Sequence, residues 1–289
     1  MNKTLLIGAK GQVGRELQST LSGDVTALGR EDLDLTQKEQ ICQVIDSLQP
    51  NLIVNAAAYT AVDKAETEKD LAESINAIAP KILAAECAKI GATLIHISTD
   101  YVFDGTKNTP YLEADKTNPL GVYGQTKRAG EIAIQNSEAK HIILRTAWVY
   151  GTYGKSNFVK TMLRLAKERA ELRVVTDQVG SPTRALDIAN AIAALTLQDG
   201  CESIYHFTNS GVASWYDFAV AIFEEAEKLG FPLKIKQVVP IATSEYPTPA
   251  KRPAYSVLSS KKISKILGNH PPHWRESLRE MLQKLSTEQ

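Results

Sequence analysis

The stretch Gly8-Ala9-Lys10-Gly11-Gln12-Val13-Gly14 directly follows an aliphatic run, Lys3–Ile7, and opens a segment with helical spacing. Glycines in such a stretch permit a tight turn, a close approach of the backbone to a pyrophosphate, and close helix–strand packing. The helix N-terminus then presents free N–H groups to phosphate. The spacing is G-x-x-G-x-x-G rather than G-x-G-x-x-G, and alone it also fits a turn without a ligand. Its place between a strand and a helix predicts a dinucleotide-binding turn.

Working outward from this turn, the first half of the chain alternates short aliphatic runs with segments of helical periodicity. The predicted strands are Lys3–Ile7, Val25–Leu28, Leu52–Asn55, Thr93–Ile97 and His141–Arg145. The predicted helices are Gln12–Leu21, Thr36–Leu48, Leu71–Ile90 and Val122–Gln135. Continuous apolar strands separated by helices imply a parallel sheet covered on both faces. The predicted fold class is therefore α/β, a doubly wound parallel (Rossmann) sheet.

The alternation becomes less regular after about Gly151. The predicted elements there are helices at Asn157–Arg169, Thr183–Leu197 and Ser214–Leu229, a strand at Leu172–Val175, and a turn at Asp177–Pro182. We predict a dinucleotide-binding domain of residues 1–150. Residues 151–289 form mainly a smaller substrate-binding domain, with some of its segments returning to pack on the first.

Composition excludes several function classes. The 289 residues carry 33 basic and 33 acidic side chains, so no global positive field attracts nucleic acid or anionic lipid. The isolated Cys42, Cys87 and Cys201 form neither a disulfide framework nor a metal-binding spacing. No uncharged stretch reaches the roughly 20 residues that span a bilayer, and no signal-peptide core is present. We expect a soluble cytoplasmic protein that binds neither nucleic acid nor membrane.

The end of the second predicted strand bears on cofactor choice. NAD-preferring proteins of this class place a carboxylate there for the adenosine ribose, but this chain reads Leu28-Gly29-Arg30. An arginine can meet the additional phosphate of NADP, which favours NADPH over NADH. Glu31 and Asp32 follow directly and could neutralise Arg30, so a solvated arginine at a strand end remains an alternative.

The pentad Tyr123-Gly124-Gln125-Thr126-Lys127 carries the strongest chemical signal. Residues four apart lie on one helix face, so the phenol and the ammonium can converge on one site. We expect the Lys127 charge to lower the pKa of Tyr123 toward working pH, making it a proton donor. Such a pair is frequent by chance on helix surfaces. Its predicted partner, Ser98-Thr99-Asp100, ends the fourth strand, where open α/β sheets place their ligand crevice.

Two further segments are candidates for ligand binding. Asn55-Ala56-Ala57-Ala58-Tyr59-Thr60 ends the third strand with small residues that let a flat adenine and ribose approach, although tight packing also explains them. Lys251-Arg252 precedes Pro253 in a turn-rich segment that could bring these cations over a diphosphate, with a structural role as the alternative. His96, His206, His270 and His273 lack metal-ligand spacing, so we interpret them as structural and predict no metal site.

Together, the glycine-rich turn, Ser98-Thr99 and Tyr123-x-x-x-Lys127 resemble the extended short-chain dehydrogenase/reductase superfamily. Longer stretches resemble, more closely, its dTDP-4-dehydrorhamnose reductase family. These stretches are the glycine-rich turn, Val54 to Glu66, Ser98 to Phe103, Arg145 to Tyr150 and Tyr246 to Pro253. The resemblance covers the chain from the first strand to the C-terminal segment.

The resemblance implies NAD(P)H-dependent reduction of the 4-keto group of dTDP-4-dehydro-6-deoxy-L-mannose to dTDP-L-rhamnose. It makes Tyr123 the proton donor, Lys127 its activator and a ribose ligand, and Thr99 the partner of the reacting oxygen. Asp100 and Trp148 would contact the sugar. The cofactor would be held by Gly11, Gln12, Val13, Asp34, Leu35, Ala58, Tyr59 and Thr60. Some members are magnesium-linked dimers, and Glu16 matches one ligand; magnesium use, and monomer against homodimer, stay open.

Three alternatives compete with this resemblance. Related sugar-nucleotide dehydratases carry Asp-Glu after the threonine, but here Asp100 is followed by Tyr101, which argues against dehydration. A non-catalytic NADP-binding regulatory subunit, resembling the β subunit of methionine adenosyltransferase, shares the fold and related motifs. The intact Thr99, Tyr123 and Lys127 favour an enzyme, and a reductase of another nucleotide sugar also stays open.

Overall fold

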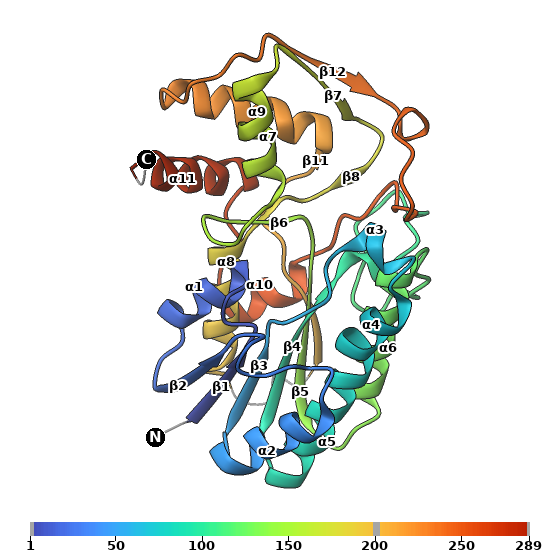
Figure 1. Cartoon of the computed structure of the whole chain (residues 1–289), viewed down its shortest axis with the longest axis vertical. Helices are drawn as coiled ribbons and strands as arrows, with labels where there is room; N and C mark the ends of the chain where they lie inside the picture. Colours follow the sequence, from blue (N-terminus) through green and yellow to red (C-terminus); the bar gives the residue numbers. More distant parts are fainter. Residues whose placement is uncertain (1–2, 199–202, 288–289) are drawn as a thin grey trace.

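A six-stranded parallel sheet with the order β2-β1-β3-β4-β5-β10 runs through the lower part of the molecule in Figure 1. The computed structural model describes residues 3–198 and 203–287, and Cys201 lies outside them. The strands are β1 (Lys3–Ile7), β2 (Asp24–Leu28), β3 (Leu52–Asn55), β4 (Thr93–Thr99), β5 (Lys140–Thr146) and β10 (Ser203–His206). Every pairing within this sheet is parallel. The predicted doubly wound α/β fold is confirmed.

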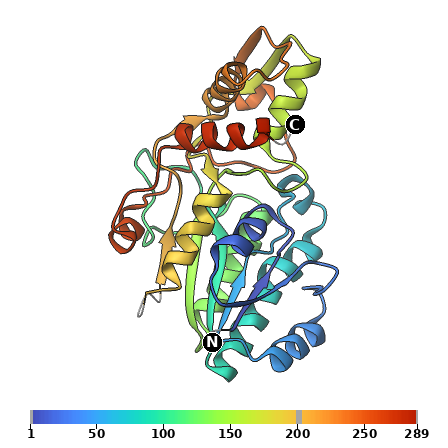
Figure 2. The same cartoon turned by 90° about the vertical axis from the view of Figure 1, so that its left-hand side faces the viewer.

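Helices cover both faces of the sheet (Figures 1 and 2). One face is covered by α1 (Gln12–Thr20), α8 (Ala185–Leu195) and α10 (Lys261–Leu267), and the other by α2 (Lys38–Leu48), α5 (Ala79–Ile90) and α6 (Val122–Gln135). Consecutive strand residues such as Leu5 and Leu6 are both fully buried, one in each of the two apolar clusters. The continuous apolar runs of the sequence therefore reflect burial on two faces.

The predicted helix Leu71–Ile90 is interrupted in the structure. It consists of α4 (Lys69–Glu73), a π-helical turn η1 (Ser74–Ile78) and α5. The π turn carries the buried Asn76, whose Oδ1 accepts from the Tyr59 N–H at 2.9 Å and whose Nδ2 donates to the Tyr59 carbonyl at 3.1 Å. The irregular turn thus fixes the loop that follows β3. Short π turns of this kind occur frequently at functional sites.

The upper part of the molecule in Figure 1 is built by residues after β5. Its elements are β6 (Val149–Tyr150), α7 (Phe158–Glu168), β7 (Glu171–Val175), β8 (Val179–Gly180), β9 (Thr183–Arg184), β11 (Ala213–Ser214), α9 (Trp215–Lys228), β12 (Gln237–Ile241) and α11 (Trp274–Thr287). Helices α7, α9 and α11 share an apolar cluster centred on Phe218 and Trp274. Later segments, namely α8, β10 and α10, pack on the main sheet. The domain boundary at residue 151 stays a prediction.

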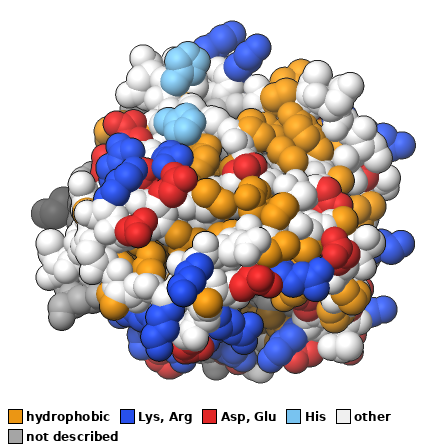
Figure 3. Space-filling view, turned by 90° about the horizontal axis from the view of Figure 1, so that it is seen from above, with side chains coloured by type: hydrophobic (Ala, Val, Ile, Leu, Met, Phe, Trp, Pro, Cys, Tyr) orange, Lys and Arg blue, Asp and Glu red, His pale blue; other side chains and the backbone are white. Residues whose placement is uncertain are grey.

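Three short helices complete the described elements: α3 (Val62–Ala65), and the 3-10 turns η2 (Asp100–Val102) and η3 (Thr243–Glu245). Among the residues that the structure describes, no helix is both long enough and apolar enough to cross a bilayer. Basic and acidic side chains lie close together on the face in Figure 3, so charges of one sign do not cover this end of the molecule.

Candidate active site

The ligand crevice lies where the sheet order reverses. Strand β1 pairs with both β2 and β3, and the chain leaves β1 toward α1 on one face and β3 toward α5 on the other. Connections that diverge in this way leave a crevice at the carboxyl ends of the strands. A cavity of about 820 Å³ lies there, within the range of small-molecule sites. Most of the predicted site residues line it: Gly8, Gly11, Gln12, Val13, Arg30, Asp34, Leu35, Ala57, Ala58, Tyr59, Thr60, Thr99, Asp100, Tyr123, Lys127 and Trp148.

The glycine-rich turn has the geometry of a phosphate-binding loop. Gly8 has φ +86°, and a Cβ there would lie 2.6 Å from the Ala57 nitrogen. A Cβ on Gly14 would lie 2.1 Å from the Gly8 carbonyl oxygen, so Gly14 permits close packing beneath the turn and does not line the cavity. Helix α1 has neither a side-chain cap nor an acidic residue in its first turn. Its N-terminal N–H groups are therefore placed to bind an anion.

The loop after β2 leaves Arg30 exposed at the cavity. Glu31 forms an ion pair with Lys10, and Asp32 Oδ2 accepts from the Gly29 N–H at 2.9 Å. Neither carboxylate is paired with Arg30, contrary to the neutralisation that their sequence positions allowed. Hydrogen bonds from Thr36 hold the pKa of Asp34 below its ordinary value, with a smaller contribution from the Arg30 charge. Arg30 is thus available to an anionic ligand group.

The loop after β3 is fixed by polar contacts at both ends. The Asn55 side chain accepts from the Ala57 N–H at 3.1 Å. The Tyr59 hydroxyl donates to Glu68 at 2.6 Å, and this hydrogen bond raises the pKa of Tyr59 to about 12. Ala57 and Ala58 therefore present small side chains to the cavity on a rigid backbone.

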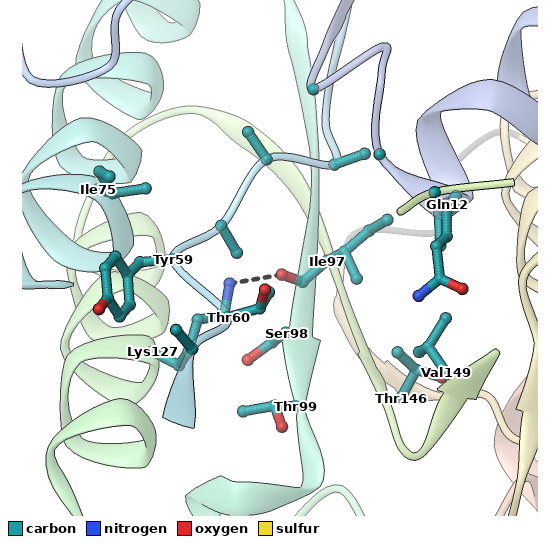
Figure 4. Close-up of a pocket in the computed structure, with 18 of the residues that line it drawn as sticks. Gln12, Tyr59, Thr60, Ile75, Ile97, Ser98, Thr99, Lys127, Thr146 and Val149 are labelled. Carbon is teal, nitrogen blue, oxygen red and sulfur yellow. Dashed lines mark hydrogen bonds between the residues drawn. The ribbon is translucent and has the colours of Figure 1, made fainter. Parts of the chain in front are cut away.

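Thr99, Tyr123 and Lys127 converge at the far end of the cavity from Arg30. Thr99, the last residue of β4, is buried, and its hydroxyl donates to Asp100 Oδ1 at 3.0 Å. Lys127 Nζ donates to the Ile97 carbonyl at 2.7 Å (Figure 4, dashed line). The same nitrogen lies 3.1 Å from Nε2 of the buried His96. His96 is therefore a neighbour of the predicted active site, in contact with Lys127.

The expected effect of Lys127 on Tyr123 is wrong. Burial raises the pKa of Tyr123 to about 12, with a further rise from the Asp100 charge and an opposing effect of the Thr99 hydrogen bond. Lys127 does not lower it because its ammonium is directed toward Ile97 and His96. Burial also lowers the pKa of Lys127 to about 8. Tyr123 in this structure is a protonated phenol at neutral pH, as a proton donor must be.

Of the three residues assigned to the substrate, two line the cavity and one does not. Asp100 lines the cavity, and burial raises its pKa to about 6. Trp148 also lines it, at φ +48°, with its ring stacked on Trp215 at a centroid distance of 3.5 Å. Arg252 is not part of the cavity lining. Its guanidinium donates to Asp63 Oδ2 at 2.8 Å and so joins the C-terminal segment to helix α3.

Several lining residues were missed by the sequence analysis. They include Ile97, Thr146, Val149, Lys155 and Ser156. Thr146 ends β5, so the strand-end rule that singled out Thr99 could also have found it. Lys155 and Ser156 lie in an irregular loop where Gly154 packs against Gln12, and no sequence signal marked that contact. Within residues 3–198 and 203–287, no group of three or more His, Cys, Asp or Glu side chains is placed to hold a metal ion.

Comparison with known proteins agrees with this geometry. The family model described as "RmlD substrate binding domain" matches residues 1–287. The chain is 45% identical to the dTDP-4-dehydrorhamnose reductase of Escherichia coli (strain K12), with 98% of each protein covered. The chain belongs to the dTDP-4-dehydrorhamnose reductase family. It is also 45% identical to the spore coat polysaccharide biosynthesis protein SpsK of Bacillus subtilis (strain 168), with 99% of each covered.

Solved structures place this family member in the same fold. The dTDP-4-dehydrorhamnose reductase from Bacillus anthracis, solved in complex with NADP, superposes with a TM-score of 0.92 at 39% identity, over 98% of this chain and 100% of that one. The UDP-glucose 4-epimerase of Thermus thermophilus, at 21% identity and a TM-score of 0.79, shows the shared fold alone. The suspected family is confirmed, and with it the prediction that the chain is an enzyme, an oxidoreductase.

Proposed function

We propose that this chain reduces the 4-keto group of dTDP-4-dehydro-6-deoxy-L-mannose to give dTDP-L-rhamnose, with NADPH as the preferred reductant and NADH as a possible one. The observation that carries the proposal is that Thr99, Tyr123 and Lys127 line one cavity together with the glycine-rich turn. A proton donor beside a dinucleotide cradle suits carbonyl reduction, which needs a hydride, a proton and correct positioning. The names of the relatives support the substrate.

The residues present fit a phosphorylated dinucleotide. The uncapped N-terminus of α1 would bind the pyrophosphate, and the exposed Arg30 would bind the phosphate on the adenosine ribose. Ala57 and Ala58 would let the adenosine lie against the loop after β3. Other lining residues would complete the cofactor site, namely Gln12, Val13, Asp34, Leu35, Tyr59 and Thr60.

The chemistry is divided among Tyr123, Thr99 and Lys127. Bound NADPH would supply the hydride to the carbonyl carbon. Tyr123 gives its phenolic proton to the carbonyl oxygen, so that the C=O bond becomes CH–OH. Thr99, whose hydroxyl donates to Asp100 Oδ1 in this structure, would turn that hydrogen to the same oxygen. Lys127, in contact with His96, would bind the nicotinamide ribose and support reprotonation of Tyr123.

Substrate binding is assigned to three further residues. Asp100 and Trp148 contact the sugar, and Arg252 binds the diphosphate after exchanging its Asp63 partner for the ligand. Arg252→Ala should therefore weaken binding of dTDP by roughly ten- to a hundredfold, since a charge-assisted hydrogen bond contributes about 1.5–3 kcal/mol. Unchanged dTDP affinity in titration calorimetry would leave Arg252 with only its contact to Asp63.

One experiment tests the proposed reaction. The purified chain is mixed with NADPH and a panel of dTDP-, UDP- and GDP-linked 4-keto sugars, and NADPH oxidation is followed by absorbance. The expected result is turnover with the dTDP sugar well above the others. Turnover with a different nucleotide sugar would reassign the substrate. NADPH binding without turnover of any of them would support the regulatory-subunit alternative.

A further inference from the structure

Three buried side-chain atoms in the described part of the chain have no hydrogen-bond partner: Thr20 Oγ1, Asp100 Oδ2 and Thr146 Oγ1. Burying an unsatisfied polar group destabilises the folded state. Asp100 and Thr146 nevertheless line the cavity, and they lie at the carboxyl ends of the adjacent strands β4 and β5. Asp100 is already assigned to the sugar. The hydroxyl of Thr146 has no role in the chemistry described above.

The position of Thr146 indicates what it faces. It is 4% exposed and pairs in register with Thr99 across β4 and β5. In Figure 4 it lies beside Val149, on the side of the cavity where Gln12 of the glycine-rich turn also lies, whereas Lys127 lies on the opposite side of Thr99. Thr146 therefore lies on the same side of Thr99 as the glycine-rich turn.

The sheet order fixes the direction of a bound dinucleotide. Arg30 follows β2 and the glycine-rich turn follows β1, while Thr99 and Thr146 end β4 and β5. With the adenosine phosphate at Arg30 and the pyrophosphate at α1, the nicotinamide can extend only across β3, toward β4 and β5. The polar substituent of a nicotinamide ring is a primary carboxamide, which both donates and accepts hydrogen bonds, as a threonine hydroxyl does.

We propose that the Thr146 hydroxyl binds the carboxamide of the nicotinamide and thereby fixes which face of the ring meets the keto sugar. This inference rests on the proposed use of NADPH. It explains why a hydroxyl that is unsatisfied within the described protein is placed at the end of a buried strand. An aliphatic residue of the same shape, such as valine, would be at least as stable there.

The test compares Thr146→Val with a matched control, Thr20→Val, which removes the other unpartnered hydroxyl at a site outside the cavity. Titration calorimetry measures binding of NADP⁺ and of the same molecule without its nicotinamide, 2′-phospho-ADP-ribose. Because a neutral hydrogen bond is involved, Thr146→Val should weaken NADP⁺ binding about three- to tenfold and leave 2′-phospho-ADP-ribose unchanged. Thr20→Val should change neither, and Thr146→Ser, which keeps the hydroxyl, should restore NADP⁺ affinity.

Three results would overturn the inference. Equal NADP⁺ affinity in Thr146→Val and the wild type would mean that the hydroxyl does not contact the cofactor. Weakened binding of dTDP-L-rhamnose with unchanged NADP⁺ affinity would place the hydroxyl on the sugar. Equal weakening of both cofactor ligands, with a lowered Tm, would indicate a structural role. Failure of the wild-type chain to bind NADP⁺ is a separate result, because it would refute the proposed cofactor itself.

Discussion

The two ends of the cavity differ in how far their side chains are exposed to solvent. At the end that contains Thr99 and Tyr123, Thr99 is buried and hydrogen-bonded to Asp100, and Lys127 is only 1% exposed. At the end that contains Arg30, the side chains are exposed, and the nearby Lys10–Glu31 ion pair is more than half exposed on both sides. On the proposed function, the reaction chemistry is tied to the stability of the fold, whereas cofactor choice is set by side chains that can change with little effect on folding.

A buried ion pair links the end that contains Thr99 and Tyr123 to the stability of the fold. Glu131 of α6 accepts from Arg145 of β5 at 2.7 and 2.8 Å and from Ser98 of β4 at 2.6 Å. Glu131 and Arg145 are at most 1% exposed. These contacts join the helix that carries Tyr123 to the two strands that carry Thr99 and Thr146. Variants at the two ends can therefore test this difference.

The largest effect is expected at Tyr123. Tyr123→Phe removes the proton donor with little change in volume, and a positioned acid contributes roughly 10²–10⁴-fold to rate. We expect kcat to fall by that factor while NADPH still binds. Tyr255→Phe, outside the cavity, is the matched control and should retain wild-type kcat. A Tyr123→Phe variant with near wild-type kcat would assign proton donation to another group.

The next effect concerns stability. Glu131→Ala leaves the Arg145 charge buried without its carboxylate, which should lower the free energy of unfolding by about 3–5 kcal/mol. Glu31→Ala breaks an exposed ion pair and should change it by at most about 1 kcal/mol. Urea denaturation of both variants checks the contrast. Similar losses for the two variants would show that the two ends are equally coupled to folding.

At the adenosine end we expect an effect on cofactor choice alone. Arg30→Ala removes a charge-assisted contact worth about 1.5–3 kcal/mol, so the KM for NADPH should rise roughly ten- to a hundredfold while that for NADH changes little. Steady-state kinetics with both cofactors measures this, and the free energy of unfolding should stay at the wild-type value. A parallel rise in both KM values would refute the role of Arg30 in reading the phosphate.

The smallest effect is a pH dependence of stability. Because burial holds the pKa of Lys127 at about 8, below its ordinary 10.5, the unfolded chain binds more protons than the folded one between these values. Stability should therefore rise with pH across this window, by about 1–2 kcal/mol between pH 8 and 9.5. Lys127→Met should lack this contribution. Urea unfolding of both proteins at the two pH values measures the difference, and identical pH dependence would contradict the buried amine.

Much of the sheet could be predicted from local pattern. The predicted bounds of β1, β3 and α6 match the structure, because burial on two faces and helical periodicity both leave a clear signal in sequence. No prediction covered β10, which gains its role in the sheet only by pairing with β5, about 60 residues earlier in the chain.

The candidate site, like the sheet, could be predicted from the sequence only in part. Strand-end positions predicted Thr99 and the loop after β3, because strand order places carboxyl ends together. The direction of the Lys127 ammonium could not be predicted, since it depends on His96 and the Ile97 carbonyl, about 30 residues away in the chain. The same holds for Arg252, whose partner Asp63 is separated from it by 189 positions. Long-range contacts of this kind decide charge and orientation and leave no local pattern.

Strand β10 also has a consequence for how the chain is made. During synthesis, β5 leaves the ribosome about 60 residues before β10, an interval of roughly 3–12 s at 5–20 residues per second. Throughout that interval the hydrogen-bonding groups along one side of β5 have no strand to pair with. An open edge of this kind can pair with another chain. The order of synthesis therefore makes nascent copies of this protein vulnerable to association at β5, and a holdase chaperone that covers this edge would improve its yield.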